Sequence, residues 1–346
     1  MNPLIWSILV STLSTSTIIT MSSHHWLLAW LGLELNTLSI LPIIMKPKHP
    51  RATEATTKYF LIQTTAAALI LFASTLNAWE TGNWNITLSP SALASTILLS
   101  AILLKLGIAP AHLWYPDIIQ GSNMTTALVI STWQKLAPLT LLYLTINHTS
   151  ITAIMMAGSI SIFVGGWAGL NQTQTRKIMA FSSIAHMGWL IIALIMNPQL
   201  ATITLITYIL LTSTMFLSMT MTTSKTLQDL GISWSYSPAL SAATLITLMS
   251  LGGLPPLTGF MPKLLILKEL TLYSLAPMGT MLALMSLPSL YFYTRMAYLT
   301  AITTPPNTTC TKYNWLFKTY QKPTPTLTIP LATMILPMLP ALYNAT

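Results

Sequence analysis

The feature that most constrains this chain is a succession of long apolar runs separated by short polar connections. A helix needs about 20 apolar residues to cross the hydrocarbon layer of a membrane. Eleven runs approach or exceed this length, at residues 3–21, 26–45, 57–79, 91–118, 124–146, 150–170, 177–196, 200–222, 237–272, 276–301 and 325–343. The connections at 46–50, 81–83, 197–198 and 304–307 are rich in Pro, Gly and Asn, which end helices. The sequence therefore predicts a single membrane domain over residues 1–346.

Charged side chains are too few for a soluble protein of this size. Only 15 Lys and Arg and 6 Asp and Glu occur among 346 residues, which is 6%, against roughly 25% in an average soluble domain. This excludes an ordinary soluble enzyme and a disordered chain. The net charge of +9 lies in short loops rather than on one exposed face. We therefore expect contact with lipids and no nucleic acid.

Other chemistry-bearing patterns are weak. Cys310 is the single cysteine, and the sequence has no CxxC or CxxH cluster, so we expect no metal site and no cofactor bound by this chain. The glycines at 165 and 169 follow no strand, which favours close helix packing over nucleotide binding. The segment Met1–Trp6 has no basic region, so we expect no signal or transit peptide.

Two apolar runs are too long for one pass, and each contains a helix-breaking motif. Gly107–Pro110 interrupts the run 91–118, and Gly252–Gly259, with two prolines, interrupts the run 237–272. Backbone groups freed by a break at membrane depth need a protein-lined or wet cavity. We therefore predict that the fourth and ninth spans are discontinuous and form a transport site. Two kinked helices without a role are the alternative.

The spacing of the two breaks predicts the architecture. They lie five spans apart, which fits two five-helix repeats at residues 1–146 and 150–301 and one extra C-terminal helix at 325–343. Because five is odd, the second repeat would be inverted in the membrane. The predicted fold class is an all-α polytopic membrane protein with about eleven transmembrane helices. This repeat is inferred from counting spans, because the halves share no evident residue-level similarity beyond the breaks.

Loop charges predict the orientation. By the positive-inside rule, the even-numbered loops and the N-terminus face the side of synthesis, and the C-terminus faces the opposite side. Lys58 and Arg295, near span ends, are expected to extend to the membrane surface. The even loops hold Lys46, Lys48, Arg51, Arg176, Lys177, Lys225, Lys312, Lys318 and Lys322. An aromatic belt at the interfaces is expected from Trp26, Tyr59, Trp79, Trp84, Trp114, Tyr115 and Tyr143.

Five ionisable side chains lie deep within the predicted spans: Glu34, Lys105, Lys135, His186 and Lys263. A charge at mid-bilayer costs about 2.5–3.5 kcal/mol, so such residues persist when they pair, face water or move protons. We predict that these five form a hydrated proton relay, with His112 as a further residue lining its cavity. Two alternatives stay open: a static ion pair between Glu34 and one lysine, and a packing role for His186.

The stretches Lys105–Asp117 and Gly253–Lys263 each contain one of the two helix breaks. They resemble the first and second broken-helix signatures of the antiporter-like membrane subunits of respiratory complex I, in particular the subunit 2 branch of that family in vertebrate mitochondria. The match covers nearly the whole chain. It also includes Met1–Pro3, Glu54–Phe60, Asn171–Lys177 and Phe181–Trp189.

The resemblance implies a core membrane subunit that takes part in proton translocation across the mitochondrial inner membrane. This step is coupled to electron transfer from NADH to ubiquinone in other subunits of the NADH:ubiquinone reductase. It implies no redox chemistry in this chain, with NADH, FMN, iron–sulfur clusters and ubiquinone bound elsewhere in the complex. The family's channel glutamate maps to Glu34, and its three lysines map to Lys105, Lys135 and Lys263.

The resemblance also implies partners and sidedness. Other complex I membrane subunits, including neighbouring antiporter-like subunits, would contact this chain. The longer family members carry three further N-terminal spans, so a neighbouring subunit would have to cover the edge left here. The N-terminus and basic loops would face the matrix, and the C-terminus would face the intermembrane space. Two other functions stay open: a stand-alone cation/proton antiporter, and a structural subunit with a vestigial relay.

Overall fold

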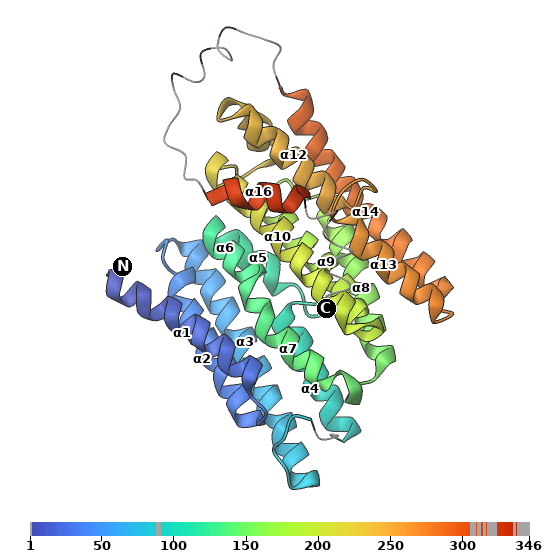
Figure 1. The fold of residues 1–346 in the computed structure, drawn as a ribbon. Helices are drawn as coiled ribbons and strands as arrows, with labels where there is room; N and C mark the ends of the chain where they lie inside the picture. The colour runs from blue at the N-terminus through green and yellow to red at the C-terminus, as the bar shows by residue number, and fades with distance from the viewer. Residues whose placement is uncertain are drawn as a thin grey trace. The chain divides into compact units, whose positions relative to one another are not determined.

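The computed structural model describes residues 2–87, 91–304 and 324–334, and the single positions 309, 313, 316 and 337. The described chain folds into helices joined by short turns (Figure 1). It divides into two compact units, Met1–Ala157 (unit 1) and Gly158–Thr346 (unit 2). The boundary falls within the helix α8, Ile151–Gly169.

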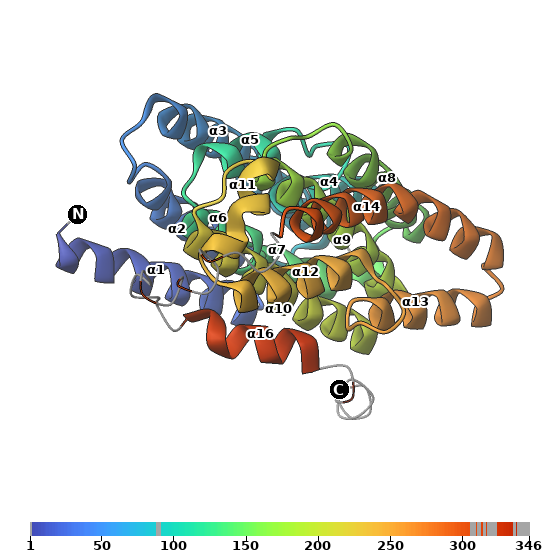
Figure 2. The ribbon, with the colours of Figure 1, turned by 90° about the horizontal axis from the view of Figure 1, so that it is seen from above.

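Unit 1 is built around the long helix α3. This helix packs against α2, α4 and α5, and α1 packs against α2 and α7 (Figures 1 and 2). The elements of unit 1 are α1 (Pro3–Ser22), α2 (Trp26–Ile44), α3 (Pro50–Thr81), α4 (Ala92–Leu106), α5 (Trp114–Gly121), α6 (Met124–Ser131), the 3-10 turn η1 (Trp133–Lys135), α7 (Leu136–Thr145) and the 3-10 turn η2 (Ile146–His148).

Unit 2 is built around α10 and α14. The helix α10 packs against α9, α12, α13 and α16, and α14 packs against α11, α12 and α13 (Figure 2). The elements of unit 2, after α8, are α9 (Thr175–Met196), α10 (Pro198–Thr222), α11 (Leu227–Gly231), the 3-10 turn η3 (Ile232–Ser235), α12 (Pro238–Gly252), α13 (Phe260–Leu272), α14 (Ala276–Ile302) and α16 (Thr324–Met334).

Four helices begin with a proline that directly follows a capping residue. Asn2, His49, Asn197 and Ser237 each accept a backbone N–H of the first turn with their side chain. Proline suits the first helical position because its missing N–H would have no partner within the helix. The local sequence therefore fixes where α1, α3, α10 and α12 begin.

Serine and threonine side chains satisfy their hydroxyl groups within their own helices. The hydroxyls of Thr17, Thr212 and Ser250 each donate to a backbone carbonyl three or four residues earlier, at 2.7 Å. This local bond removes the need for water or another helix. It explains how a threonine-rich chain forms apolar helices.

The glycines at 165 and 169 mark close helix packing, as the sequence predicts. A Cβ on Gly165 would lie 2.7 Å from the backbone nitrogen of Ala185, on α9. A Cβ on Gly169 would lie 2.9 Å from the ring of Phe292, on α14. Only glycine allows these neighbours to approach so closely.

Seven helices in the described part of the chain are long and apolar enough to cross a membrane by length and composition. They confirm a helical membrane protein. The two predicted discontinuous spans correspond to the shorter apolar helices α4 and α12, of 15 residues each, which a turn separates from α5 and α13. The seven segments that could cross a membrane are 3–22, 26–44, 50–81, 124–148, 151–169, 175–196 and 198–222. The segment 124–148 comprises α6, η1, α7 and η2.

The finer architecture stays a prediction. This holds for the count of eleven spans, the discontinuity of the fourth and ninth as membrane spans, the single domain and the inverted repeats. The predicted C-terminal helix at 325–343 overlaps α16 as far as Met334. Cys310, Lys312, Lys318, Lys322 and most of 335–343 lie outside the described residues.

Candidate functional site

The first interruption follows from a glycine that ends α4. Gly107 takes a left-handed conformation with φ of 69°. Its N–H donates to Leu104 at 3.2 Å, and the N–H of Ile108 donates to Leu103 at 3.1 Å. This is the Schellman end of a helix, which strongly favours glycine. Residues 107–113 then lead into α5.

Two lysines are buried beside this interruption. Lys105 lies in the last turn of α4, where the helix dipole favours a cation, and is 7% exposed. Lys135 lies in η1 and is 4% exposed. Its Nζ lies 4.9 Å from the centre of the Tyr115 ring, at a distance typical of a cation–π contact.

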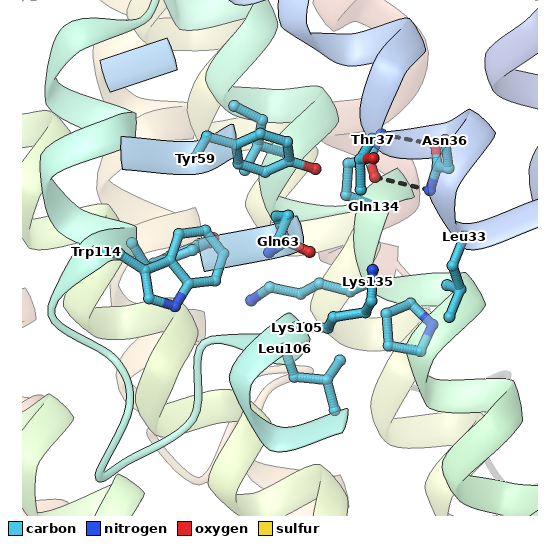
Figure 3. A pocket seen from close by; sticks show the side chains of 13 residues that line it. Leu33, Asn36, Thr37, Tyr59, Gln63, Lys105, Leu106, Trp114, Gln134 and Lys135 are labelled. Carbon is cyan, nitrogen blue, oxygen red and sulfur yellow. Dashed lines mark hydrogen bonds between the residues drawn. The ribbon is translucent and has the colours of Figure 1, made fainter. Parts of the chain in front are cut away.

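Lys105 and Lys135 line the same cavity, which we call the unit 1 cavity. Figure 3 shows both side chains extending into one space near Gln63 and Trp114. The space open to the centre of a water molecule is about 20 Å³. That volume holds about one water, which could accept a proton from one lysine and donate to the other. It is too small for a quinone or nucleotide.

The position of Lys135 depends on an irregularity that the sequence analysis missed. We expect one helix over 124–146 from the sequence, whereas α6 ends at Ser131 and the 3-10 turn η1 precedes α7. Pro138 has no N–H to donate to the carbonyl of Gln134, and its ring clashes with that carbonyl in a regular helix. Pro138 was therefore the sequence signal for this third irregularity.

Several functional candidates in unit 1 were not predicted. Asn36 and Gln134 exchange two side-chain hydrogen bonds, at 2.8 and 3.0 Å, beside the cavity. The signal for these residues and Gln63 was available, because amides inside apolar runs need a partner. The aromatic belt is wrong for Tyr59, Trp114 and Tyr115, which are buried and line the cavity. It is also wrong for Trp26, which is buried. Trp79 and Tyr143 are exposed and Trp84 is partly exposed, so their place in a belt stays a prediction.

Glu34 and His112 are not among the residues that line the unit 1 cavity. Glu34 is partly buried on α2, and its Oε2 is shielded from solvent without a hydrogen-bond partner in the described part of the chain. The Nδ1 of His112 lies 3.1 Å from the carbonyl of Pro110. The relay role of Glu34 and the lining role of His112 stay predictions.

The second interruption repeats the glycine device in unit 2. Gly253 is left-handed, with φ of 84°, and ends α12. Its N–H donates to Ser250 at 3.0 Å. Lys263, from α13, donates its Nζ proton to the carbonyl of Gly252 at 3.1 Å. The ammonium group therefore binds the negative end of α12.

His186 and Lys263 line a cavity of about 30 Å³ in unit 2, which we call the unit 2 cavity. It has room for one or two waters. The Nε2 of His186 lies 3.4 Å from the hydroxyl of Tyr293, and its ring lies 5.8 Å from the ring of Tyr208. Neither tyrosine was predicted, because a tyrosine in an apolar run carries no signal that separates a site from ordinary packing.

The sequence analysis also missed a charged cluster that lies apart from the unit 1 and unit 2 cavities. The Nζ of Lys58 lies 2.7 Å from Glu54 and 2.8 Å from Asp117, and joins α3 to α5. With Arg51 and Gln120 these residues line a polar cavity of about 160 Å³. The Lys58 side chain is 38% exposed, so its expected extension to the surface is not contradicted, and the turn after α4 brings Asp117 to it as a partner. Arg295 donates to the carbonyl of Leu170 at 3.0 Å.

Comparison with known proteins identifies the family of this chain. The family model described as NADH:quinone oxidoreductase/Mrp antiporter, TM, matches residues 23–301. The chain belongs to this family. A second model, NADH dehydrogenase subunit 2 C-terminus, matches residues 290–343. These matches confirm the resemblance drawn from the broken-helix motifs.

Relatives of this family match over their full lengths. NADH-ubiquinone oxidoreductase chain 2 of Carassius auratus is 51% identical and covers 100% of both chains. The chain 2 of Gallus gallus is 50% identical over 99% of both. A chain in the structure of respiratory complex I from Thermus thermophilus with bound aureothin is 28% identical, with a TM-score of 0.83 over 98% of this chain and 80% of that one.

Proposed function

We propose that this chain is a membrane subunit of a complex of the NADH–ubiquinone oxidoreductase type and takes part in proton translocation. The observation that carries the proposal is the convergence of Lys105 and Lys135 on one water-sized cavity beside an interrupted helix. Two buried lysines that share a cavity repel each other when both are charged, so one favours the neutral form. Such a pair can accept and release a proton.

Each relay residue then has a distinct role. Lys105 holds a proton at the end of α4, and a neutral Lys135 accepts it through a bridging water. The carboxylate of Glu34, when ionised, stabilises the charged form of Lys105 through space. In unit 2, Lys263 holds its proton against the carbonyl of Gly252. His186, in the same cavity, accepts or donates at Nε2.

The proposed setting follows the relatives. The chain carries no redox chemistry, and the NADH, FMN, iron–sulfur clusters and ubiquinone are bound by other subunits. Neighbouring antiporter-like subunits contact it in the mitochondrial inner membrane. The N-terminus and basic loops face the matrix, and the C-terminus faces the intermembrane space. The eleven spans, the two discontinuous spans and the inverted repeats belong to this proposal.

The decisive experiment is Lys105→Met in the assembled complex, with protons pumped per electron as the readout. We expect pumping or coupled turnover to fall while assembly stays intact, because methionine keeps the volume of lysine but holds no proton. Lys225→Met is the matched control, since Lys225 is an exposed loop residue. Unchanged pumping in Lys105→Met would overturn the proposal and favour the alternative of a structural subunit with a vestigial relay. Cation/proton exchange by the isolated chain in liposomes would favour the antiporter.

A further inference from the structure

A pair of amides, one buried and one partly buried, joins two elements of the unit 1 cavity. The Nδ2 of Asn36 donates to Oε1 of Gln134 at 2.8 Å, and the Nε2 of Gln134 donates to Oδ1 of Asn36 at 3.0 Å (Figure 3). Asn36 is 3% exposed. The two bonds connect α2 with the 3-10 turn η1, which lie 98 residues apart in the chain.

Each amide of the pair is close in sequence to a residue of the proposed relay. Gln134 directly precedes Lys135 in η1, and Asn36 follows Glu34 by two residues in α2. A 3-10 turn has poorer hydrogen-bond geometry than an α-helix. Here the N–H of Lys135 reaches the carbonyl of Thr132 only at 3.4 Å. The turn therefore depends on a tertiary contact to keep its shape.

The chemistry of an amide pair suits this place. Two reciprocal hydrogen bonds fix both distance and orientation, and each amide supplies the donor and the acceptor that the other needs. Neither side chain gains or loses a proton at physiological pH. The pair can therefore hold two elements together without trapping a proton that should pass between the lysines.

We propose that Asn36 and Gln134 are positioning residues, which fix η1 to α2 and so keep Lys135 in the unit 1 cavity beside Lys105. A displacement of the helix that carries Glu34 is then passed to Lys135 through two hydrogen bonds. The inference rests on the proposed function, because it concerns how Lys135 is presented for proton transfer.

The test uses the assembled complex with Asn36→Leu and Gln134→Met, which keep side-chain volume and remove the amides. We expect pumping-coupled turnover to fall at least about tenfold, within the roughly 100-fold that a displacement of about 1 Å can cost. The pH profile of turnover should also change, since Lys135 no longer holds its place. The double variant should lose no more than the worse single variant, because both break the same contact.

Two further variants make the test specific. Asn36→Gln combined with Gln134→Asn keeps the number of methylene groups and both amides, so it should restore pumping and the wild-type pH profile. Asn77→Leu is the matched control, because Asn77 is a buried amide in unit 1 whose side chain has no hydrogen-bond partner among the described residues. It should leave protons per electron and the pH profile unchanged.

The outcomes separate this inference from the proposed function. Normal pumping in Asn36→Leu, or the same pH profile with merely less assembled complex, overturns the positioning role. Additive losses in the double variant also overturn it. Lys135→Met tests the function itself. If Lys135→Met abolishes pumping and Asn36→Leu does not, only the positioning role fails, whereas normal pumping in Lys135→Met overturns the proposed function.

Discussion

The two interruptions share a backbone device but differ in how the second half-helix is held. In each unit a left-handed glycine, Gly107 or Gly253, ends the first half-helix with a Schellman cap. In unit 1 the lysine of the site precedes the glycine, and α5 is tied to α3 by the Lys58–Asp117 ion pair. In unit 2 the lysine follows the break, and Lys263 itself binds α12.

This difference separates the tasks of the two regions. Among the described residues, no carbonyl accepts a hydrogen bond from Lys105 and holds its proton in one geometry, and a separate ion pair ties α5 to α3. Lys263 serves two tasks, because the ammonium group that would carry a proton also stabilises the end of α12. Neutral Lys263 keeps only an uncharged amine against Gly252, so its proton loss should loosen the interruption of unit 2 more than loss at Lys105 loosens that of unit 1.

The largest expected effect concerns backbone contact inside the unit 2 interruption. A Cβ on Gly259 would overlap the carbonyl oxygen of Ser250, so Gly259→Ala should destabilise the chain by about 3 kcal/mol or more. The measurement is the amount of chain retained in the complex after heating. Gly279→Ala is the control, since its nearest neighbour would lie 3.5 Å away. Equal retention of both variants would show that this turn can relax.

The next effect concerns the interruption of unit 1. Gly107→Ala adds left-handed strain of about 1–2 kcal/mol, and its Cβ would lie 3.2 Å from the Trp114 ring and 3.3 Å from Cβ of Tyr115. Gly82→Ala has the same strain without neighbours within 4 Å. We expect Gly107→Ala to be the less heat-stable variant and to reduce pumping. Equal heat stability of the Gly107→Ala and Gly82→Ala variants would mean that Trp114 and Tyr115 move to make room for the added methyl group.

The third prediction tests the double task of Lys263. Lys263→Met removes the cation from the end of α12, which should cost about 1 kcal/mol. Amide hydrogen exchange should accelerate at residues 249–254, the last turn of α12 and the start of the break. Lys105→Met serves as the comparison. It should change the rate of amide hydrogen exchange in the break that follows α4 less than Lys263→Met changes the rate in the break that follows α12. A larger increase in amide exchange from Lys105→Met in unit 1 than from Lys263→Met in unit 2 would contradict the proposed difference between the units.

A smaller effect is expected from the charged cluster of unit 1. Lys58→Met removes two partly exposed ion pairs, which should lower heat stability only slightly because water screens them. The loss should shrink at high salt, because the side chains are exposed enough to be screened. Asp117→Asn alone and combined with Lys58→Met completes a double-mutant cycle for the α3–α5 contact. A loss that is independent of salt would argue against an electrostatic tie.

The smallest effect concerns a carboxylate outside the spans of unit 2. The backbone N–H groups of Lys225 and Thr226 donate to Asp229 at 2.9 and 2.8 Å and lower the pKa of its carboxyl group. This stabilisation is present above the unfolded pKa, near 4, and is lost as the pH falls through the lower folded value.

Asp229→Asn should therefore lower heat stability by a constant amount near neutral pH, and the difference should vanish in acid. The measurement is retention of the chain in the complex after heating, at a series of pH values. This variant also separates an ordinary surface carboxylate from the pH dependence of the buried lysines. A deficit that grows as the pH falls would contradict the assigned hydrogen bonds.

Much of the fold and part of the site followed from local patterns. Left-handed glycines act within a few residues, so the breaks at Gly107 and Gly253 were readable in the sequence. Pro50 was assigned to a connection before a span at 57–79, whereas α3 begins at Pro50. Lys105, Lys135, His186 and Lys263 stood out because a charge in an apolar run is costly. Tyr59, Trp114 and Tyr115 were misassigned to a membrane belt, because sequence position does not say whether an aromatic side chain faces lipid or a cavity.

The amino-acid sequence alone determined the membrane class, the breaks after α4 and α12, and the basic residues available for proton chemistry, because apolar length, backbone conformation and residue type are local properties. Only the tertiary structure decided which of these groups meet. It placed Lys105 and Lys135 in one cavity, and His186 and Lys263 in another. It also paired Asn36 with Gln134. Such contacts join residues far apart in the chain, and their geometry depends on how whole helices pack.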